Sequence, residues 1–208
     1  MGFVTAGIFA SIAVAGNAIG MEGAVLVMFS HGVLTGALFL MVGFLYERTR
    51  TRQIADMAML ATPMPVTAGF LLFFALGSLG LPGLSGFVGE FLSLLGLFLY
   101  SSWLTAIAAL GVILAAAYLL WMFQRVMFND RGVDAVKPSS ALSDLGAREI
   151  VSLLPLVVLA VWVGVYPNTF LDFLHVPVQE ILDKVMPSLE NARTGGLAQL
   201  FAGAKGLF

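Results

Sequence analysis

The stretch GSLGLPGLSGFVGEF, residues 77–91, places a run of helix-breaking residues directly before a single acid, Glu90. It lies inside a 68-residue segment from Met57 to Gln124 in which Glu90 is the one carboxylate and lysine, arginine and histidine do not occur. So apolar a segment indicates a membrane, where an isolated carboxylate is costly and marks a functional site by default. An acid beside interrupted backbone at membrane depth is typical of an ion or proton path.

The composition sets the class of protein. The chain is 60% apolar and 11% charged, with a mean hydropathy of +0.99, whereas a soluble domain carries about 25% charged residues. We therefore predict an all-α polytopic bundle of transmembrane helices, one of them discontinuous, with the lipid bilayer as its surroundings. The net charge is −2 and basic residues form no patch, which argues against nucleic acid as a partner.

The few candidate ligands argue against a cofactor or metal held by this chain. It has no cysteine, which excludes disulfides, iron–sulfur clusters and cysteine-ligated zinc. Its two histidines, His31 and His175, are too few and too far apart to suggest haem or a metal site. Neither of the common glycine-rich nucleotide-binding motifs is present.

The apolar segments predict the membrane spans, since a crossing helix needs about 20 apolar residues. We expect a partial transmembrane helix at 1–19, a span at 22–46 that carries His31, a broken span at 63–100 that carries Glu90, spans at 103–128 and 150–166, and an amphipathic tail at 168–208.

The region 63–100 can be read as one broken span or as two spans joined by a turn. One neighbouring loop holds Arg48, Arg50 and Arg52, and the other holds Arg125, Arg131, Lys137 and Arg148. A single broken span puts both loops on the same face of the membrane. The positive-inside rule favours that topology, with both loops cytoplasmic and the tail on the outer side.

The interruption itself is built from glycine and proline. Glycines recur at positions 77, 80, 83, 86 and 89, each costing up to about 1 kcal/mol of helix propensity and Pro82 about 3. Glu90 is then expected near the start of the second half-helix. The helix dipole there favours an ionised carboxyl and burial favours a protonated one, so the group can load and release a proton. The alternative is a structural acid bonded to backbone amides of the break.

Other polar residues have both a functional and a structural interpretation. His31 suits a proton relay, because a neutral imidazole donates and accepts at once, or it bonds a neighbouring helix or the carbonyl one turn back. Gln124 and Arg125 are more typical of interface anchors, and Tyr118 is ambiguous. The charged turn from Glu47 to Arg52 orients the chain or docks a partner.

The tail contains an amphipathic pattern. Apolar residues between His175 and Leu189 have the spacing of a short helix on a membrane or partner surface. We expect Pro187 to end that helix and His175 to be solvated.

Several motifs resemble one family. They are HGVLTGALFL at 31–40, YERTRTR at 46–52, LGLPGLSGFVGEF at 79–91, YLLWMFQRVMF at 118–128, DLGARE at 144–149 and GVYP at 164–167. Together they resemble the antiporter-like membrane subunits of respiratory complex I, and the subunit M type, called subunit 4 in mitochondria, fits best. The resemblance covers most of residues 1–175 and only the C-terminal part of the family's fold, so we expect a truncated or split chain.

The resemblance implies a function. Glu90 would be the terminal proton carrier, at a position where the other antiporter-like subunits usually have lysine, and His31 would belong to the polar axis of the membrane arm. The chain would be a proton-translocating subunit of an NADH:quinone oxidoreductase in a bacterial inner membrane. NADH, FMN, iron–sulfur clusters and quinone would lie in partner subunits, and neighbouring antiporter-like subunits would be its contacts. A cation/proton antiporter or membrane-bound hydrogenase subunit, or a non-transporting fragment, remain alternatives.

Overall fold

The computed structural model describes residues 1–14, 17–57, 59–128 and 142–205, with only the backbone described for residues 189, 190 and 192–205. These residues form α-helices and one short 3₁₀ helix, with no strand among them, so the predicted all-α fold is confirmed. In chain order the elements are α1 (Gly2–Ala13), α2 (Ala18–Thr49), η1 (Ile54–Asp56), α3 (Pro65–Ser78), α4 (Ser85–Tyr100), α5 (Ser102–Met127), α6 (Ala147–Val165) and α7 (Asn168–Lys205).

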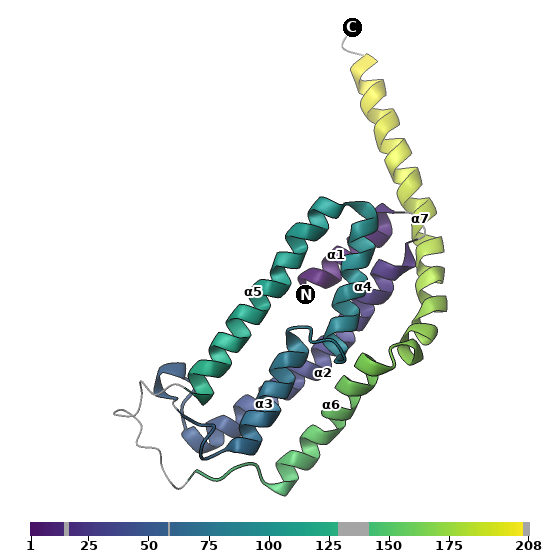
Figure 1. Cartoon of the computed structure of the whole chain (residues 1–208). Coiled ribbons are helices and arrows are strands. Elements are labelled where there is room, and N and C mark those ends of the chain that lie inside the picture. The colour runs from purple at the N-terminus through teal and green to yellow at the C-terminus, as the bar shows by residue number, and fades with distance from the viewer. Residues whose placement is uncertain (15–16, 58, 129–141, 206–208) are drawn as a thin grey trace.

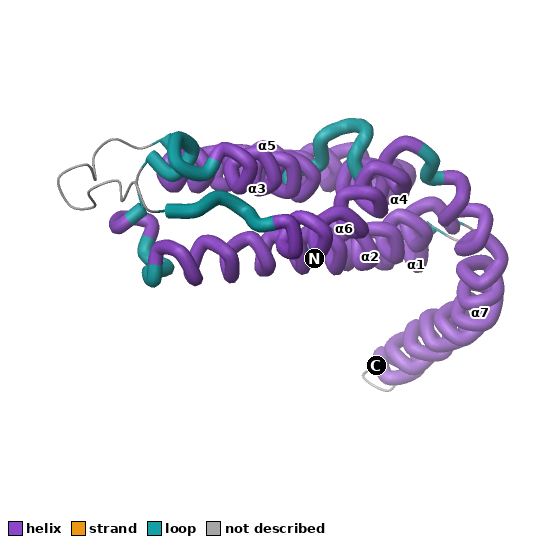
Figure 2. The backbone as a smooth tube through the Cα atoms, turned by 90° about the horizontal axis from the view of Figure 1, so that it is seen from below, coloured by secondary structure: helices purple, strands orange, loops and turns teal. Residues whose placement is uncertain are grey.

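Three of the described helices are long and apolar enough to cross a membrane: α2, α5 and α6. The shorter apolar helices α3 and α4 follow one another along the length of α2, with α5 and α6 on either side of them (Figure 1). Seen from below, the same helices form one elongated bundle from which α7 departs (Figure 2). The segment 63–100 therefore crosses the bundle once, as two half-helices.

The break between α3 and α4 consists of two turns in succession. Gly80 has φ +82° after the end of α3, and the amides of Gly80 and Leu81 donate to the carbonyls of Gly77 and Leu76 at 3.3 and 3.0 Å. This is a Schellman helix end, which requires a left-handed residue. A β-turn follows, in which Leu84 N donates to Leu81 O at 3.1 Å across Pro82 and Gly83. Gly83 has φ +92°, the conformation that the third residue of a type II turn needs.

The other glycines of the repeat serve packing. Gly77, Gly86 and Gly89 are helical, so the glycine repeat extends beyond the break into both half-helices. A Cβ on Gly86 would collide with the Gly77 carbonyl, and one on Gly89 would lie 2.6 Å from Val27 N in α2. Small side chains at such spacing let helix backbones approach closely inside membranes.

The crossing of α2 and α4 continues this pattern toward the N-terminal end of α2. A Cβ on Gly23 would lie 2.5 Å from Ser93 N, and one on Gly96 would lie 2.5 Å from Gly20 Cα. Ser30 Oγ, further along α2, donates to Ser85 O at 2.9 Å. The two helices are thus in backbone contact along most of α4, which fixes the rotation of α4.

Residues from both arginine-containing segments meet at one end of the bundle. Ala61 N donates to Met127 O at 3.1 Å, and Arg48 at the end of α2 reaches the residues just before α6. The C-terminal end of α2, the start of α3, the end of α5 and the start of α6 lie together there (Figure 1).

The helix boundaries differ from the expected ones at both termini. The first helix ends at Ala13, short of the expected 19, and α2 begins at Ala18. Pro187 does not end the tail helix: α7 runs through Pro177 and Pro187 to Lys205, so that prediction is wrong. A proline removes one backbone donor and disturbs one turn, which a long helix can absorb as a bend.

The tail is joined to the bundle by a polar contact. His175 Nδ1 lies 2.7 Å from Glu22 Oε1, and His175 Nε2 lies 3.0 Å from Gln179 Nε2. The buried carboxylate of Glu22 therefore pairs with a half-exposed imidazole across α2 and α7. The prediction that His175 is solvated is confirmed, since its side chain is 54% exposed. Its contact with Glu22 was not predicted, and it provides the hydrogen-bond partner that a buried carboxylate requires.

We predict that Gly89→Ala destabilises the protein, because its methyl group would collide with the Val27 backbone in α2. Overpacking of this kind costs about 1–3 kcal/mol of the free energy of unfolding. Gly43→Ala in α2 is the matched control, since nothing lies within 4 Å of its Cβ, and it should be neutral or stabilising by up to about 1 kcal/mol. The thermal unfolding midpoint of each variant in detergent measures this. Equal midpoints for both variants would contradict the close α2–α4 crossing.

Candidate functional site

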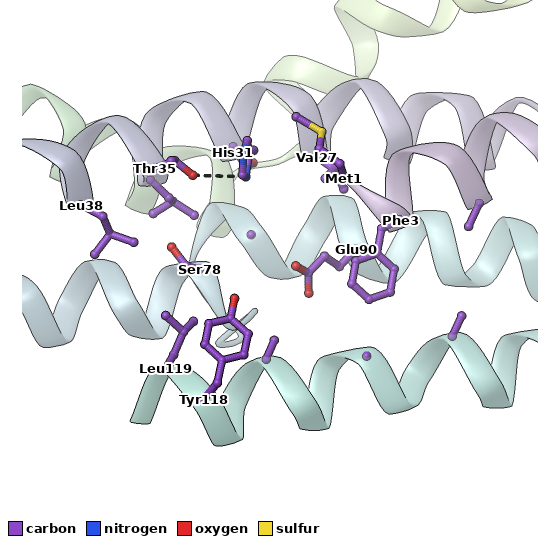
Figure 3. Close-up of a pocket in the computed structure, with 18 residues that line it drawn as sticks. Met1, Phe3, Val27, His31, Thr35, Leu38, Ser78, Glu90, Tyr118 and Leu119 are labelled. Carbon is purple, nitrogen blue, oxygen red and sulfur yellow. Dashed lines mark hydrogen bonds between the residues drawn. The ribbon is translucent and has the colours of Figure 1, made fainter. Parts of the chain in front are cut away.

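A cavity of about 490 Å³ lies between α1, α2, the broken helix and α5. Its polar lining comes from three directions: Ser30, His31 and Thr35 of α2, Ser78 and Glu90 of the broken helix, and Tyr118 of α5. The remaining lining side chains are apolar or glycine, and they include Met1, Gly2, Phe3 and Ala6 at the start of the chain. In Figure 3 the Glu90 carboxylate and the Ser78 and Tyr118 hydroxyls turn toward the space that separates these helices.

Glu90 lies in the second turn of α4, directly beyond the break. A Cβ on Gly80 would lie 2.7 Å from Glu90 Oε2, so the glycine that ends α3 also makes room for the carboxylate. No hydrogen bond or ion pair joins this carboxylate to the residues that the structure describes. The alternative of a structural acid bonded to amides of the break thus has no hydrogen bond to support it in this part of the chain.

His31 reaches the cavity from α2. Its Nδ1 lies 3.2 Å from Thr35 Oγ1, one turn further along the helix. Its partner is therefore a hydroxyl one turn on, and the expected bond to the carbonyl one turn back does not occur among the described contacts. This contact occupies Nδ1, and no hydrogen bond to Nε2 occurs among the described contacts of this exposed histidine.

The two residues singled out in the sequence thus line one cavity without touching. No direct hydrogen bond links Glu90 and His31 among the described contacts, so any exchange between them needs a mobile carrier such as water. Hydroxyls of Ser78, Thr35 and Tyr118 on the same walls are suited to hold such a carrier, because each can donate and accept. Tyr118, ambiguous in the sequence, belongs to this cavity.

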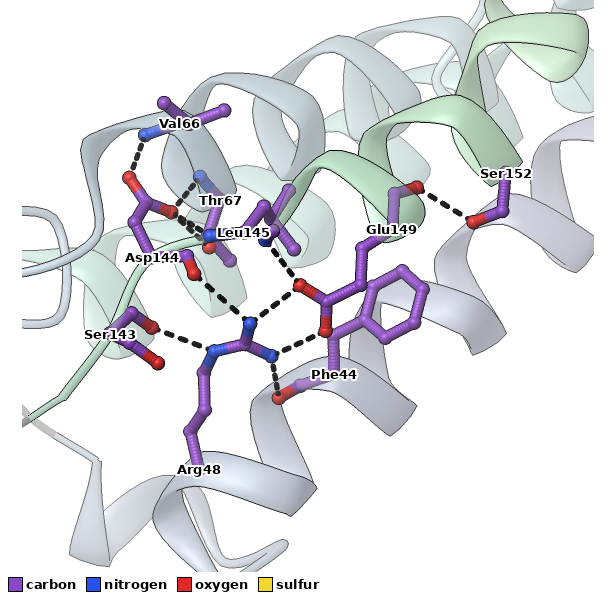
Figure 4. Close-up of polar contacts among 10 residues, drawn as sticks. Phe44, Arg48, Val66, Thr67, Ser143, Asp144, Leu145, Glu149 and Ser152 are labelled. Carbon is purple, nitrogen blue, oxygen red and sulfur yellow. Dashed lines mark hydrogen bonds and ion pairs between the residues drawn. The ribbon is translucent and has the colours of Figure 1, made fainter.

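An arginine supports the site from the end of the bundle. Arg48 uses all five of its N–H donors (Figure 4). Two go to the carboxylate of Glu149 at 2.8 and 2.6 Å, and the others go to the carbonyls of Phe44, Ser143 and Asp144 at 3.0, 2.7 and 3.1 Å. Such a bidentate and fully satisfied guanidinium fixes the end of α2 against the start of α6.

Asp144 caps the first half of the broken helix from a distant part of the chain. Its Oδ2 accepts from Val66 N at 2.7 Å, and its Oδ1 accepts from Thr67 N and Thr67 Oγ1 at 2.9 and 2.7 Å. The residue preceding α3, Met64, provides no side-chain cap. Burial acts to raise the pKa of Asp144, but hydrogen bonds from the Thr67 hydroxyl and the amides of Val66, Leu145 and Thr67 hold it below its ordinary value of 3.8.

The remaining candidates lie away from the cavity. Arg125 stacks on Trp121, with its guanidinium carbon 4.1 Å from the ring centroid, an arrangement that suits the predicted interface anchor. Arg52 likewise lies 4.7 Å from the Tyr46 ring. Within the described residues no group of three or more His, Cys, Asp or Glu side chains could hold a metal ion.

A protein-family model identifies the family to which the chain belongs. The model for the transmembrane region of NADH:quinone oxidoreductases and Mrp antiporters matches residues 1–116. The chain belongs to this NADH:quinone oxidoreductase/Mrp antiporter family. The matched residues include α1, α2, the whole broken helix and the first half of α5, and so contain both Glu90 and His31.

The similarity to complex I subunits extends along most of the chain and is not limited to the motifs. NADH-quinone oxidoreductase subunit M of Rhodobacter capsulatus is 42% identical over 203 residues, 98% of this chain and 37% of the relative. NADH-ubiquinone oxidoreductase chain 4 of Marchantia polymorpha is 44% identical over 184 residues, 88% of this chain and 35% of the relative. The predicted kinship with the antiporter-like subunits of complex I is confirmed.

A solved structure shows the same arrangement of helices. A chain in the structure of respiratory complex I from Thermus thermophilus with bound NADH matches with a TM-score of 0.76 and 39% identity over 89% of this chain and 37% of that chain. This chain thus spans little more than a third of the length of the family members it matches.

We predict that Asp144→Asn destabilises the protein by about 1 kcal/mol at neutral pH, the usual value of a helix cap. Because the pKa of Asp144 is lowered by folding, its stabilisation is complete above its ordinary pKa of 3.8 and is lost as the pH falls through the lower folded value. The difference in unfolding midpoint between wild type and Asp144→Asn should therefore shrink below about pH 4.

The matched control for this measurement is Asp56→Asn. Asp56 is an exposed aspartate near the same end of the bundle, bonded at 3.0 Å to the Thr51 hydroxyl. The Asp56→Asn substitution should change the unfolding midpoint little at either neutral or acid pH. A midpoint difference for Asp144→Asn that stays constant between neutral and acid pH would contradict the ionised cap.

Proposed function

We propose that this chain is the proton-carrying part of a membrane-arm subunit of an NADH:quinone oxidoreductase, with Glu90 as the group that loads and releases the proton. The observation that carries the proposal is the Glu90 carboxylate itself. It lies beside the break between α3 and α4, in a cavity shared with His31, and is bonded to none of the described residues. A carboxyl held this way can change protonation state without first breaking a structural bond.

The cavity suggests how the proton moves. Glu90 takes a proton from water in the cavity and returns it to water, and His31 exchanges with the same water through Nε2 while Thr35 holds Nδ1. The missing side chain at Gly80 leaves the carboxylate beside the backbone of the turn. A small movement of the break would change the distance between Glu90 and the water in the cavity, which provides a means of gating.

The redox chemistry belongs to other subunits in this proposal. NADH, FMN, iron–sulfur clusters and quinone are held by partners, and the energy of NADH oxidation and quinone reduction reaches this chain through movement and charge. Its direct contacts are other membrane subunits, above all neighbouring antiporter-like ones. The bacterial sources of several relatives favour a bacterial inner membrane, with the Arg48 end cytoplasmic and α7 toward the outer side.

A second function has one observation in its favour. The description of the family includes Mrp antiporters as well as NADH:quinone oxidoreductases, so a subunit of a cation/proton antiporter shares this fold. The relatives favour the oxidoreductase, since they are subunit M or chain 4 proteins along most of this chain. Sodium-dependent transport that does not require NADH would favour the antiporter.

We predict that Glu90→Gln, in membranes that contain the assembled complex, lowers NADH-driven proton pumping by about tenfold and quinone reduction with it, an increase of about 1.4 kcal/mol in the barrier. The amide keeps the size of the side chain but cannot carry a proton. His31→Ala should have a smaller effect of the same kind. Proton pumping is measured with a pH-sensitive dye, and assembly by native gel electrophoresis.

Glu180→Gln in α7 is the matched control, because Glu180 is an exposed acid outside the cavity. It should pump at the wild-type rate. If an assembled Glu90→Gln complex also pumped at that rate, Glu90 would not be part of the proton path, and the non-transporting alternative would be favoured.

A further inference from the structure

The tail helix α7 is attached to the bundle by its first part. Phe170 lies against Phe29 of α2 and Trp162 of α6, with ring centroids 5.5 and 6.0 Å apart. Val178 and Leu182 of α7 are buried. Beyond them α7 leaves the bundle (Figure 1). Because the helix is held over a short length, each contact in that length matters for whether α7 stays attached.

One contact in this attachment involves a buried acid. Glu22, near the start of α2, is 9% exposed, and its Oε1 lies 2.7 Å from His175 Nδ1. The side chain of His175 is 54% exposed, so it exchanges protons with solvent while the carboxylate is sheltered. A partly buried charge pair is screened much less than a pair in open solvent. The protonation state of His175 therefore changes the strength of this contact.

The geometry accommodates both protonation states of the imidazole. Gln179 Nε2 lies 3.0 Å from His175 Nε2, so with a neutral ring the amide donates to Nε2, and Nδ1 carries the ring proton that is donated to Glu22. When the ring gains a second proton, Nε2 becomes a donor, and a half-turn of the Gln179 amide presents its oxygen as the acceptor. The bond from Nδ1 to Glu22 is then charge-assisted, and such bonds are roughly twice as strong as neutral ones.

Glu22 is the buried charge that faces His175 in the described part of the chain. The packed helices add no other, since titratable side chains are absent from residues 2–13 of α1, 23–30 of α2 and 150–165 of α6. The remaining charged groups nearby are exposed and belong to α7 itself: Asp172, Glu180, Asp183 and Lys184. Among them Asp172, three residues before His175, is its neighbour on the helix surface.

We propose that Glu22 and His175 form a pH-sensitive clasp, which holds α7 against α2 and tightens as the pH falls from about 8 to about 6. Histidine ordinarily gains its second proton within this range. The attached helix then gains a charge-assisted bond and the detached helix does not, so protonation favours attachment. The added stabilisation is present at the lower pH and is lost as the pH rises. Protonation of the carboxylate in stronger acid would end it.

The clasp lies next to the helix crossing that directs Glu90. Gly23 follows Glu22, and a Cβ on Gly23 would lie 2.5 Å from Ser93 N in α4. Glu90 precedes Ser93 by three residues. With α7 on the outer side, protons that accumulate there would tighten α7 over the part of α2 that contacts α4, which is feedback by the product of pumping. This feedback rests on the proposed function, whereas the clasp itself does not.

The experiment measures the attachment of α7 directly. The chain has no cysteine, so two introduced cysteines carry spin labels at defined places. Ser102→Cys at the start of α5 and Ser188→Cys in α7 are suitable, because both serines are exposed. Pulsed electron paramagnetic resonance on the full chain in lipid nanodiscs gives the distribution of distances between the labels. We expect the ratio of attached to detached α7 to rise about fivefold between pH 8 and pH 6. An unchanged distribution would overturn the inference.

Two substitutions in the labelled chain remove the titration and keep a hydrogen bond. Glu22→Gln retains an acceptor oxygen without the charge, and His175→Asn retains an amide donor near the position of Nδ1. Both variants should show the same distance distribution at the two pH values. A wild-type pH response in either variant would show that the pair is not the clasp. If Glu22→Gln detaches α7 at both pH values, His175→Asn alone decides.

Asp172→Asn is the matched control, because Asp172 is an exposed acid one turn before His175. It should keep the full pH response. A response that disappears in Asp172→Asn and persists in Glu22→Gln would assign the effect to the surface acid and contradict the clasp.

Glu90→Gln separates this inference from the proposed function. The labelled Glu90→Gln chain should keep the pH response of α7, since the distances are measured without NADH-driven pumping. Failure of the clasp leaves the role of Glu90 unaffected. If Glu90→Gln abolishes the response while Glu22→Gln retains it, the titrating group is Glu90 and the inference is wrong.

Discussion

The close crossing of α2 and α4 is the constraint on which the site depends. Glycine and serine side chains bring the two backbones into contact at Gly23, Gly89 and Gly96, and helices in lipid associate through such van der Waals packing because no hydrophobic effect drives them together. A helix held this way cannot rotate. Glu90, one position beyond Gly89, is therefore directed past the contact and into the cavity between α2 and α5.

The break between α3 and α4 is also an ordered structure. A Schellman end and a type II turn satisfy part of the backbone that the break exposes, so the interruption is a defined structure inside the bundle. At its other end, α3 begins on the carboxylate of Asp144, which belongs to the segment before α6. The position of the break is thus set at one end by glycine packing and at the other by an ionised cap.

Much of this arrangement could be predicted from the sequence because it depends on local chemistry. The run of glycines around Pro82 indicated the break, and the isolated Glu90 indicated the site. The contacts that could not be predicted join residues far apart in the chain. Asp144 caps a helix 77 residues away, and Glu22 meets His175 across 153 residues. Nor does spacing distinguish glycines needed for turns, such as Gly80, from those needed for packing, such as Gly89. The difference depends on which helix lies opposite.

The complete hydrogen bonding of the Arg48 guanidinium limits how the helices can move. A guanidinium keeps its charge throughout the physiological pH range and binds through a rigid, planar set of donors, and here each donor already has an acceptor. Sliding α2 relative to α6 would break several of these bonds together, so this corner acts as a fixed pivot. The turns from Gly80 to Gly83 hold no such charged network, and their contacts are three backbone hydrogen bonds of 3.0 to 3.3 Å. A displacement in the proposed proton cycle would therefore break fewer bonds at these turns than at Arg48, and Glu90 lies next to them.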